Sequence, residues 1–264
     1  MNPQKALITG ASSGIGATYA NRLARRDYDL VLVARDGKRM AALAEQLHAD
    51  TGARVEVISA DLTVEADLAN IEQRLLQDDI TLFLNNAGMA LKGGLLDNGP
   101  TELTRIISLN VIAPTRLAAA AGKRFVARGS GSIVNIASVL ALVPEMLDGV
   151  YSGTKAFVLN LSQSMAAQMA QQGVYVQAVL PGATRTEIWE RAGNDLNAVP
   201  AEMVMDVNDL VDAALVGFDR RETVTIPPLH DDNQFAAMTE ARLAMASNLS
   251  TSTMAPRYRA SIAK

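Results

Sequence analysis

Three side chains suited to proton transfer lie in the second half of the sequence. Tyr151 and Lys155 are four residues apart, which places both on one face if this stretch is helical. A tyrosine with a pKa near 10 is a poor acid or base at neutral pH, but an adjacent ammonium group lowers that pKa by roughly 1 to 3. Ser138, at the end of an apolar run, adds a hydroxyl that can hydrogen-bond an oxygen. The three residues predict acid–base chemistry at an oxygen atom of a substrate.

A glycine-rich stretch near the N-terminus has the composition of a phosphate-binding turn. It reads Thr9-Gly10-Ala11-Ser12-Ser13-Gly14-Ile15-Gly16 and lies between an apolar run and a helical pattern. Glycines let the backbone turn tightly and approach a pyrophosphate, while free N–H groups and the helix dipole face the anion. No Gly-Lys-Ser/Thr follows, which argues against an NTP-hydrolysing P-loop. The stretch predicts a dinucleotide site, and a purely structural turn is the alternative.

The elements that must position these groups can be read from the rest of the sequence, in which short apolar runs alternate with longer helical patterns. Parallel strands covered on both faces read as continuous apolar runs, and the first six runs do so. The intervening segments are long enough for crossover helices, so we predict one α/β domain over residues 1–264 with a doubly wound parallel sheet of about seven strands flanked by helices. The predicted strands are residues 6–9, 30–34, 55–59, 80–85, 132–137, 174–180 and 223–226, and the predicted helices are residues 14–26, 37–50, 64–77, 101–128, 150–172 and 208–221.

Five motifs follow one another along this alternation in an order that resembles a known family. They are the glycine-rich turn, Asn85-Asn86-Ala87-Gly88, Leu109-Asn110-Val111, Tyr151-Ser152-Gly153-Thr154-Lys155 with Ser138 before it, and Pro181-Gly182-Ala183-Thr184-Arg185-Thr186. The sequence resembles the short-chain dehydrogenase/reductase family, in its single-domain Thr-Gly-x-x-x-Gly-x-Gly form, over about residues 5–226. The resemblance implies a Rossmann fold and an enzyme that uses a nicotinamide cofactor to interconvert a carbonyl and a secondary alcohol.

The resemblance also implies a role for individual residues. Tyr151 would exchange a proton with the substrate oxygen, Ser138 would hydrogen-bond that oxygen, and Lys155 would support Tyr151 and hold the nicotinamide ribose. Asn110 would hold a water that links Lys155 to solvent, although a helix-bending or capping role is an alternative. The implied catalytic residues are therefore Asn110, Ser138, Tyr151 and Lys155. The implied cofactor-binding residues are Gly10, Ser12, Ser13, Gly14, Ile15, Gly16, Arg35, Asp61, Leu62, Asn86, Ala87, Gly88, Tyr151, Lys155, Pro181, Gly182, Thr184 and Thr186.

The residues after the second predicted strand favour NADP over NAD. An NAD-selecting site places a carboxylate on the ribose 2′-hydroxyl about 20 residues after the glycines, and Asp36 is the rival candidate for that role. Aligned on the family's pattern, however, Ala34 takes the position of this carboxylate and Arg35 follows it, as in NADP-dependent members. Arg35 can then bind the 2′-phosphate through its guanidinium fork. In this interpretation Asp36 points to solvent, and Lys38 or Arg39 adds positive charge.

Composition and charge exclude several other functions. The 264 residues include no cysteine and two histidines, so we expect neither a disulfide framework nor a Cys- or His-rich metal site. The net charge of −4 and the scattered Lys and Arg residues offer no basic surface for nucleic acid. No apolar run approaches the roughly 20 residues that span a bilayer, and no secretory signal is visible. We therefore expect a cytoplasmic protein with a small-molecule substrate and with neither nucleic acid nor a membrane as partner.

The substrate is expected to be largely apolar, because apolar residues follow several of the motifs. The same side chains could instead form core or an oligomer contact, and Glu145 and Asp148 could instead prefer a cationic group. Residues 187–205, after the sixth predicted strand, are a candidate substrate lid. The apolar residues are Val139-Leu140-Ala141-Leu142-Val143, Met89, Leu91 and Trp189.

The chain is also expected to self-associate. The family commonly pairs the helices predicted at 101–128 and 150–172 between subunits, which implies a homotetramer or a homodimer. The run Ala118-Ala119-Ala120-Ala121-Gly122 would permit close helix approach, or it could pack against its own sheet. Residues 229–264 form a C-terminal extension, in which we predict a packed helix at 233–247 and a frayed end.

Two other functions compete with a dehydrogenase. A protein that only senses or scaffolds through a bound nicotinamide cofactor needs no turnover, but the complete set of four catalytic residues argues against it. An epimerase or dehydratase that uses the cofactor transiently is disfavoured by the turn spacing and by the lack of a second domain for a sugar nucleotide. A net change in the absorbance of the reduced nicotinamide would separate the dehydrogenase from both.

Overall fold

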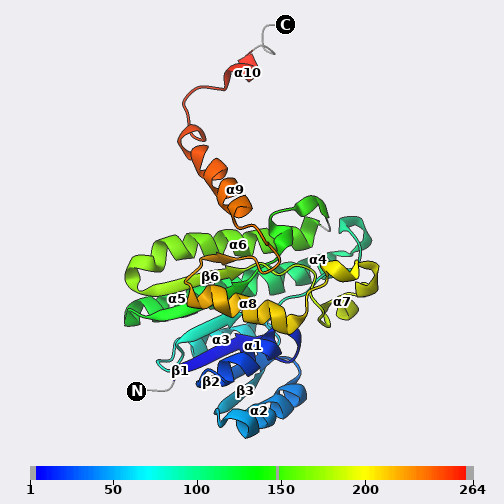
Figure 1. The fold of residues 1–264 in the computed structure, drawn as a ribbon, viewed down its shortest axis with the longest axis vertical. Helices are drawn as coiled ribbons and strands as arrows, with labels where there is room; N and C mark the ends of the chain where they lie inside the picture. The colour runs from blue at the N-terminus through cyan, green and yellow to red at the C-terminus, as the bar shows by residue number, and fades with distance from the viewer. Residues whose placement is uncertain (1–3, 147–148, 260–264) are drawn as a thin grey trace. The chain divides into compact units, whose positions relative to one another are not determined.

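Seven strands lie side by side in one parallel sheet, in the order β3-β2-β1-β4-β5-β6-β7 (Figure 1). The computed structural model describes residues 4–146 and 149–259, and all of the named helices and strands lie within those ranges. The strand order reverses between β1 and β4, as in a doubly wound sheet, which confirms the predicted fold class. The strands are β1 Gln4–Thr9, β2 Tyr28–Ala34, β3 Val55–Ser59, β4 Leu82–Asn85, β5 Gly131–Ile136, β6 Val174–Val179 and β7 Val224–Thr225.

Helices cover both faces of this sheet. Successive residues of a strand point to opposite faces, so Ile8 of β1 joins a core with α1, α2 and α8, whereas Leu7 joins a core with α3, α5 and α6. None of the helices in the described part of the chain is long and apolar enough to cross a bilayer. The helices around the sheet are α1 Gly14–Ala24, α2 Gly37–Thr51, α3 Glu65–Leu75, α4 Pro100–Ile107, α5 Ala113–Arg128, α6 Gly149–Met169, α7 Ile188–Arg191 and α8 Val207–Asp219.

The helix predicted for residues 101–128 changes its hydrogen bonding in the middle. A π-helical turn, Ser108–Ile112, separates α4 from α5, and the N–H of Ala113 donates to the carbonyl of Ser108. Pro114 has no N–H, so the carbonyl of Asn110 cannot receive the usual α-helical bond from it. The predicted helical stretch is therefore confirmed over residues 101–128, but it is not a regular α-helix throughout, and the wider turn carries Asn110.

The small residues of α5 face the interior of their own chain. Ala118, Ala120 and Ala121 are buried in the core beneath the sheet, and a Cβ on Gly122 would lie 2.8 Å from the Met169 methyl carbon. Of the run predicted to permit helix approach between subunits, Ala119 is exposed and the others are buried. The run therefore packs on its own sheet, because its apolar side chains fill the space between α5 and the strands.

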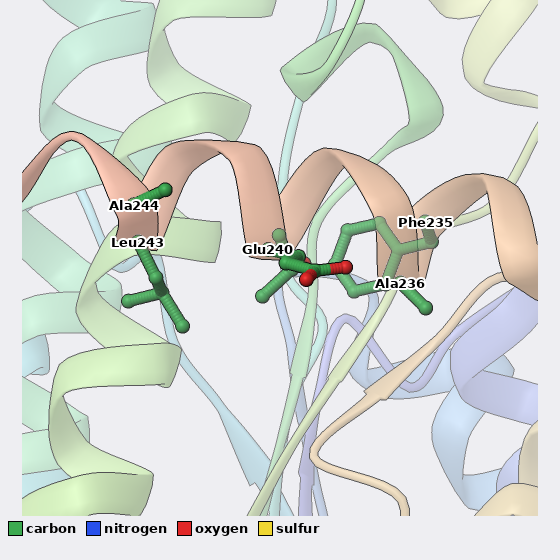
Figure 2. Close-up of a pocket in the computed structure, with 6 residues that line it drawn as sticks. Phe235, Ala236, Glu240, Leu243 and Ala244 are labelled. Carbon is green, nitrogen blue, oxygen red and sulfur yellow. The ribbon is translucent and has the colours of Figure 1, made fainter.

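The chain divides into two compact units, Met1–Pro228 and Leu229–Lys264. The second unit contains α9 Asn233–Ala244, which ends before the predicted residue 247, and α10 Pro256–Arg259. Within this unit no residue of α9 is buried. Figure 2 shows side chains along α9 that line a shallow hollow, and none of them belongs to the predicted site. The lining residues are Phe235, Ala236, Thr239, Glu240, Leu243 and Ala244.

Candidate active site

The carboxyl ends of four strands bring most of the predicted site residues to one edge of the sheet. The glycine-rich turn follows β1, Asn86 to Gly88 follow β4, Ser138 follows β5, and the segment 181–186 follows β6. Ligands of open α/β sheets bind at this edge, next to the point where the strand order reverses. Helix α6 crosses the same region, where the Nζ of Lys155 donates a 2.9 Å hydrogen bond to the carbonyl of Ile136 at the end of β5.

Ser138, Tyr151 and Lys155 converge, as their predicted roles require. The Ser138 side chain hydrogen-bonds the Tyr151 phenol, and the Lys155 Nζ lies 5.8 Å from the centroid of the Tyr151 ring. The N–H of Leu140 donates to the Ser138 Oγ over 3.2 Å, which orients the hydroxyl at the start of a short 3₁₀ turn, Val139–Ala141. Ser138 and Lys155 are buried, whereas Tyr151 is partly exposed. The arrangement can present a phenol and a hydroxyl to one substrate oxygen.

Burial, rather than charge, dominates the acid–base properties of this cluster. Desolvation raises the pKa of Tyr151 to about 12, and the hydrogen bond with Ser138 opposes that rise. Desolvation also lowers the pKa of Lys155 to about 8. Desolvation therefore outweighs the lowering of the Tyr151 pKa that was expected from Lys155. At neutral pH the phenol is protonated, which is the form that donates a proton.

Asn110 holds the loop after β4 against α6. Its Nδ2 donates to the Met89 carbonyl at 2.8 Å and to the Thr154 Oγ1 at 3.1 Å, while its Oδ1 accepts from the Met89 N–H at 2.9 Å. A Cβ on Gly88 would lie 3.4 Å from this Oδ1 and 3.5 Å from the Lys155 Nζ. Asn110 and Lys155 thus both lie close to Gly88, and the water that Asn110 would hold remains a prediction.

The glycine-rich turn leaves the N-terminus of α1 open. Gly10 and Gly14 have φ angles of 66° and 52°, and a Cβ on Gly16 would collide with the carbonyl of Gly10. Ser13 is the N-cap of α1, but its side chain caps no N–H, and the first turn has no acidic residue. The positive end of this helix is therefore available to an anion, so the turn fits the pyrophosphate of a dinucleotide.

Asn86 holds the glycine-rich turn in place through hydrogen bonds to Thr9. Its Nδ2 donates to the Thr9 carbonyl at 2.9 Å, and its backbone N–H donates to the Thr9 Oγ1 at 3.0 Å. The neighbouring Asn85 is buried and donates to the Asn135 Oδ1 and to the Pro114 carbonyl, each at 3.0 Å. These amides tie the end of β4 to β1, β5 and α5, and they set the spacing of the strand ends.

The charged side chains after β2 and β3 differ in whether they have a hydrogen-bond or ion-pair partner. Asp36 is exposed, as expected, and its carboxylate also caps α2 by accepting from the Arg39 N–H at 3.0 Å. The Arg39 guanidinium pairs with Glu187. Arg35 is exposed and makes no ion pair within the part of the chain that the structure describes. Burial would raise the pKa of Asp61, but hydrogen bonds from Thr63 and the nearby charge of Arg35 hold it below its usual value.

The segment after β6 folds back over the sheet edge and is held at several points. The Trp189 Nε1–H donates to the Thr184 carbonyl at 3.0 Å, and the Asn194 Nδ2 donates to the Leu91 carbonyl at 2.9 Å. The segment contains α7 and two 3₁₀ turns, Leu196–Ala198 and Ala201–Met203. It returns to the sheet edge where Met205 pairs with Thr184 in a β-bridge.

The apolar residues predicted to contact a substrate differ in their burial, and Met89, Leu140 and Trp189 are half-buried. Leu91 is buried, and Val139, Ala141 and Leu142 pack against a small core formed with α6 and β6, as the alternative interpretation expected. Val143, in contrast, is exposed. Glu145 is exposed, whereas Asp148 lies outside the described residues. No group of three or more His, Asp or Glu side chains in residues 4–146 and 149–259 is arranged to hold a metal.

Two side chains that the sequence did not single out belong to this region. Thr154 accepts from Asn110 and donates to the Tyr151 carbonyl at 2.7 Å, and Glu187 pairs with Arg39. Thr154 lies three residues after Tyr151 on a helix, so helical spacing could have placed it near that residue. Nothing in the sequence around Glu187 indicates its partner, which lies 148 residues away.

Comparisons with known proteins agree with this geometry. The family model described as short chain dehydrogenase matches residues 4–197. A solved short-chain dehydrogenase from Sphingobium yanoikuyae, in complex with NADPH, is 54% identical with a TM-score of 0.94, over 97% of this chain and 99% of its own. A bulky-bulky ketone specific alcohol dehydrogenase from Comamonas testosteroni is 49% identical with a TM-score of 0.90, over 98% and 99% of the two chains.

A human protein shows how far the likeness extends among more distant relatives. The 17-beta-hydroxysteroid dehydrogenase type 3 of Homo sapiens is 33% identical over 185 residues, which is 69% of this chain. The chain spans 60% of the length of that relative. Since a family model matches most of the sequence and these relatives are dehydrogenases, the chain belongs to the short-chain dehydrogenase/reductase family and is an oxidoreductase.

Proposed function

We propose that this chain is an NADP-dependent oxidoreductase that interconverts a carbonyl and a secondary alcohol on a bulky, largely apolar substrate. The observation that carries this proposal is the convergence of Tyr151, Ser138 and Lys155 at the carboxyl edge of the sheet, with the phenol hydrogen-bonded to Ser138. A protonated phenol beside a hydroxyl is equipped to donate a proton to a carbonyl oxygen. The glycine-rich turn, on the same edge, is open to an anion.

In the reductive direction, Tyr151 donates its phenolic proton to the carbonyl oxygen of the substrate. Ser138 hydrogen-bonds the same oxygen and favours the charge that develops on it. A bound nicotinamide cofactor would supply the hydride. Lys155 stabilises the phenolate that remains, and its pKa of about 8 lets it exchange a proton near neutral pH. Asn110 would hold the water through which the proton is replaced from solvent.

The preference for NADP rests on the residues after β2. Arg35 is exposed there and Ala34 leaves room beside it, while the Asp36 carboxylate is engaged by the N–H of Arg39. A guanidinium without an ion-pair partner among the described residues can form two hydrogen bonds with the ribose 2′-phosphate. The NADPH complex of the Sphingobium relative supports this proposal.

The loops that surround the site support the proposal that the substrate is bulky and apolar. Exposed apolar side chains occur on the loops after β4, β5 and β6, where a substrate would enter. The relative from Comamonas testosteroni is described as specific for bulky-bulky ketones. Residues 187–205 would cover the substrate as a lid. The exposed apolar residues are Leu95, Leu96, Val143, Met146 and Met203.

We further propose that the protein forms a homotetramer or homodimer. The buried alanines of α5 do not support this, but other apolar residues on the same helical layer remain exposed. Ile107 ends α4, Ile112 lies in the π-helical turn, and Phe157 lies on α6, and each is more than a third exposed. Two copies that paired these helices would remove the three side chains from water.

Turnover with a panel of carbonyl compounds tests the function. Purified protein and NADPH are mixed with bulky apolar ketones, small keto acids, aldehydes and quinones, and the oxidation of NADPH is followed by absorbance. We expect turnover, with the best rates for bulky apolar ketones. A protein that binds NADPH but oxidises it with none of the compounds would instead be a sensor or scaffold. Higher rates with small keto acids than with apolar ketones would contradict the proposed substrate class.

A further inference from the structure

An ion pair joins the two sides of the crevice at the edge of the sheet. Arg39 and Glu187 form a two-pronged contact, with Nη1 to Oε2 at 2.8 Å and Nη2 to Oε1 at 2.9 Å. Arg39 lies in the first turn of α2, which follows β2, whereas Glu187 follows β6. In the sheet, β1, β4 and β5 lie between those two strands. The contact therefore spans the carboxyl ends of three strands, including the point where the strand order reverses.

A second contact reinforces this bridge. A Cβ placed on Gly14 would lie 3.1 Å from the Thr186 Cγ2, so the Thr186 side chain rests against the glycine-rich turn. Thr186 and Glu187 are consecutive residues. Thr186 touches the connection between β1 and α1, and Glu187 touches the start of α2, which follows β2. A dinucleotide that occupies the crevice would run between the glycine-rich turn and the α2 side. Residues 186–187 would then lie along its outer side.

A pocket lies beside the Arg39–Glu187 ion pair. A cavity of about 520 Å³ adjoins Thr186 and Glu187 and is lined by one face of α1, which includes Ala17, Thr18 and Asn21. The parts of the segment on either side are held elsewhere, by the β-bridge between Thr184 and Met205 and by the hydrogen bond of Asn194. These anchors do not involve the Arg39–Glu187 ion pair, so breaking the pair leaves them in place.

We propose that Glu187 retains the bound nicotinamide cofactor by holding Arg39, and that this ion pair breaks before the cofactor dissociates. The inference rests on the proposed function, because it requires NADP in the crevice. In this proposal Arg39 does not bind the cofactor itself: it is a positioning residue that keeps Glu187 along the outer side of the cofactor. Arg35 remains the proposed ligand of the 2′-phosphate. Arg39 and Glu187 are 49% and 38% exposed, so water and salt weaken their attraction and the effect on retention is modest.

The chain offers a matched control for this ion pair. Arg191 contacts the same Glu187 carboxylate at 2.7 Å, but it lies four residues later on the same segment and does not span the crevice. Removing Arg191 therefore changes the charge around Glu187 by the same amount as removing Arg39, without cutting the bridge. The Arg191→Gln variant should leave cofactor retention unchanged.

The test measures how fast NADPH leaves the full-length protein. A preformed complex is mixed with excess NADP⁺ in a stopped-flow instrument, and the loss of NADPH fluorescence gives the dissociation rate constant. Both Glu187→Gln and Arg39→Gln should raise this constant by about two- to fivefold, and should raise that of NADH by the same factor. The double variant R39E/E187R, which reverses the pair, should restore the wild-type value. Raised salt should speed dissociation from the wild type more than from Glu187→Gln.

Two results would overturn the inference while leaving the proposed function intact. One is NADPH binding with unchanged dissociation rates in Glu187→Gln and Arg39→Gln. The other is an Arg39→Gln variant that releases NADPH faster but NADH at the normal rate, since Arg39 would then bind the 2′-phosphate itself. If the wild-type protein binds no NADPH at all, the proposed function fails and the inference fails with it. Melting temperatures equal to that of the wild type would show that the variants are folded.

Discussion

Replacing Lys155 with methionine is expected to stabilise the cofactor-free protein and to abolish its activity. Lys155 is buried, and desolvation lowers its pKa from 10.5 to about 8, which corresponds to about 3 kcal/mol of destabilisation at neutral pH. The variant also loses the hydrogen bond to the Ile136 carbonyl and leaves that buried acceptor unpaired, at a cost of about 1–2 kcal/mol. The net gain is about 1–2 kcal/mol, and it should raise the Tm by roughly 2–8 °C for a chain of this size.

The pH dependence of this gain identifies its cause. A lysine whose pKa is lowered on folding destabilises the folded state fully below the folded pKa, near 8, and this penalty disappears as the pH rises toward 10.5. Differential scanning calorimetry of wild type and Lys155→Met should therefore show a difference in Tm at pH 7 that shrinks toward pH 10. The hydrogen bond to Ile136 is lost at every pH, so at pH 10 the variant should be equal to or less stable than the wild type.

A matched variant separates burial from the loss of one positive charge. Lys38 is exposed in the first turn of α2, and Lys38→Met should leave the Tm within about 1 °C of the wild type. If Lys155→Met shows no higher Tm than the wild type at pH 7, or a gain that is the same at pH 7 and pH 10, the desolvation of Lys155 is not the cause and the reasoning is refuted.

Four other predictions follow from the site. Tyr151→Phe should lower kcat at least a thousandfold with little change in NADPH affinity, as measured by turnover and fluorescence titration; more than about a tenth of wild-type turnover would refute the role of the phenol. Arg35→Ala should reduce the preference of kcat/KM for NADPH over NADH by roughly ten- to a hundredfold, the worth of an Arg–phosphate contact, and an unchanged ratio would exclude Arg35. Asp36→Ala should cost about 1 kcal/mol of stability through the lost cap while leaving the cofactor preference unchanged, and a shift of the ratio toward NADPH would restore Asp36 as the selecting residue. Light scattering should show an oligomer that Phe157→Glu weakens, whereas a monomeric wild type at micromolar concentration would contradict self-association.

The strands and most of the helices could be predicted from the sequence because their signals are local. An apolar run such as the one in β5 has one stable location, between two layers of helices, and the strand bounds differ from the prediction by at most two residues. The spacing of Tyr151 and Lys155 was likewise sufficient to place both residues on one helical face. The irregular turn around Asn110 was the exception, because the π-helical turn Ser108–Ile112 has no simple periodic signal.

Tertiary structure decided what depends on neighbours far along the chain. The alanines of α5 look the same in sequence whether they face a partner or their own sheet, and only the packing shows that they face the sheet. The pKa of Tyr151 depends on how completely the folded chain removes water from the phenol, and that desolvation outweighed the charge that the sequence suggested. Arg39 and Glu187 meet because the order of the strands folds the segment after β6 back toward β2, which no local pattern encodes. Residue types and spacings therefore determined the chemistry available to this protein, whereas long-range packing determined which groups are charged, paired or free to perform it.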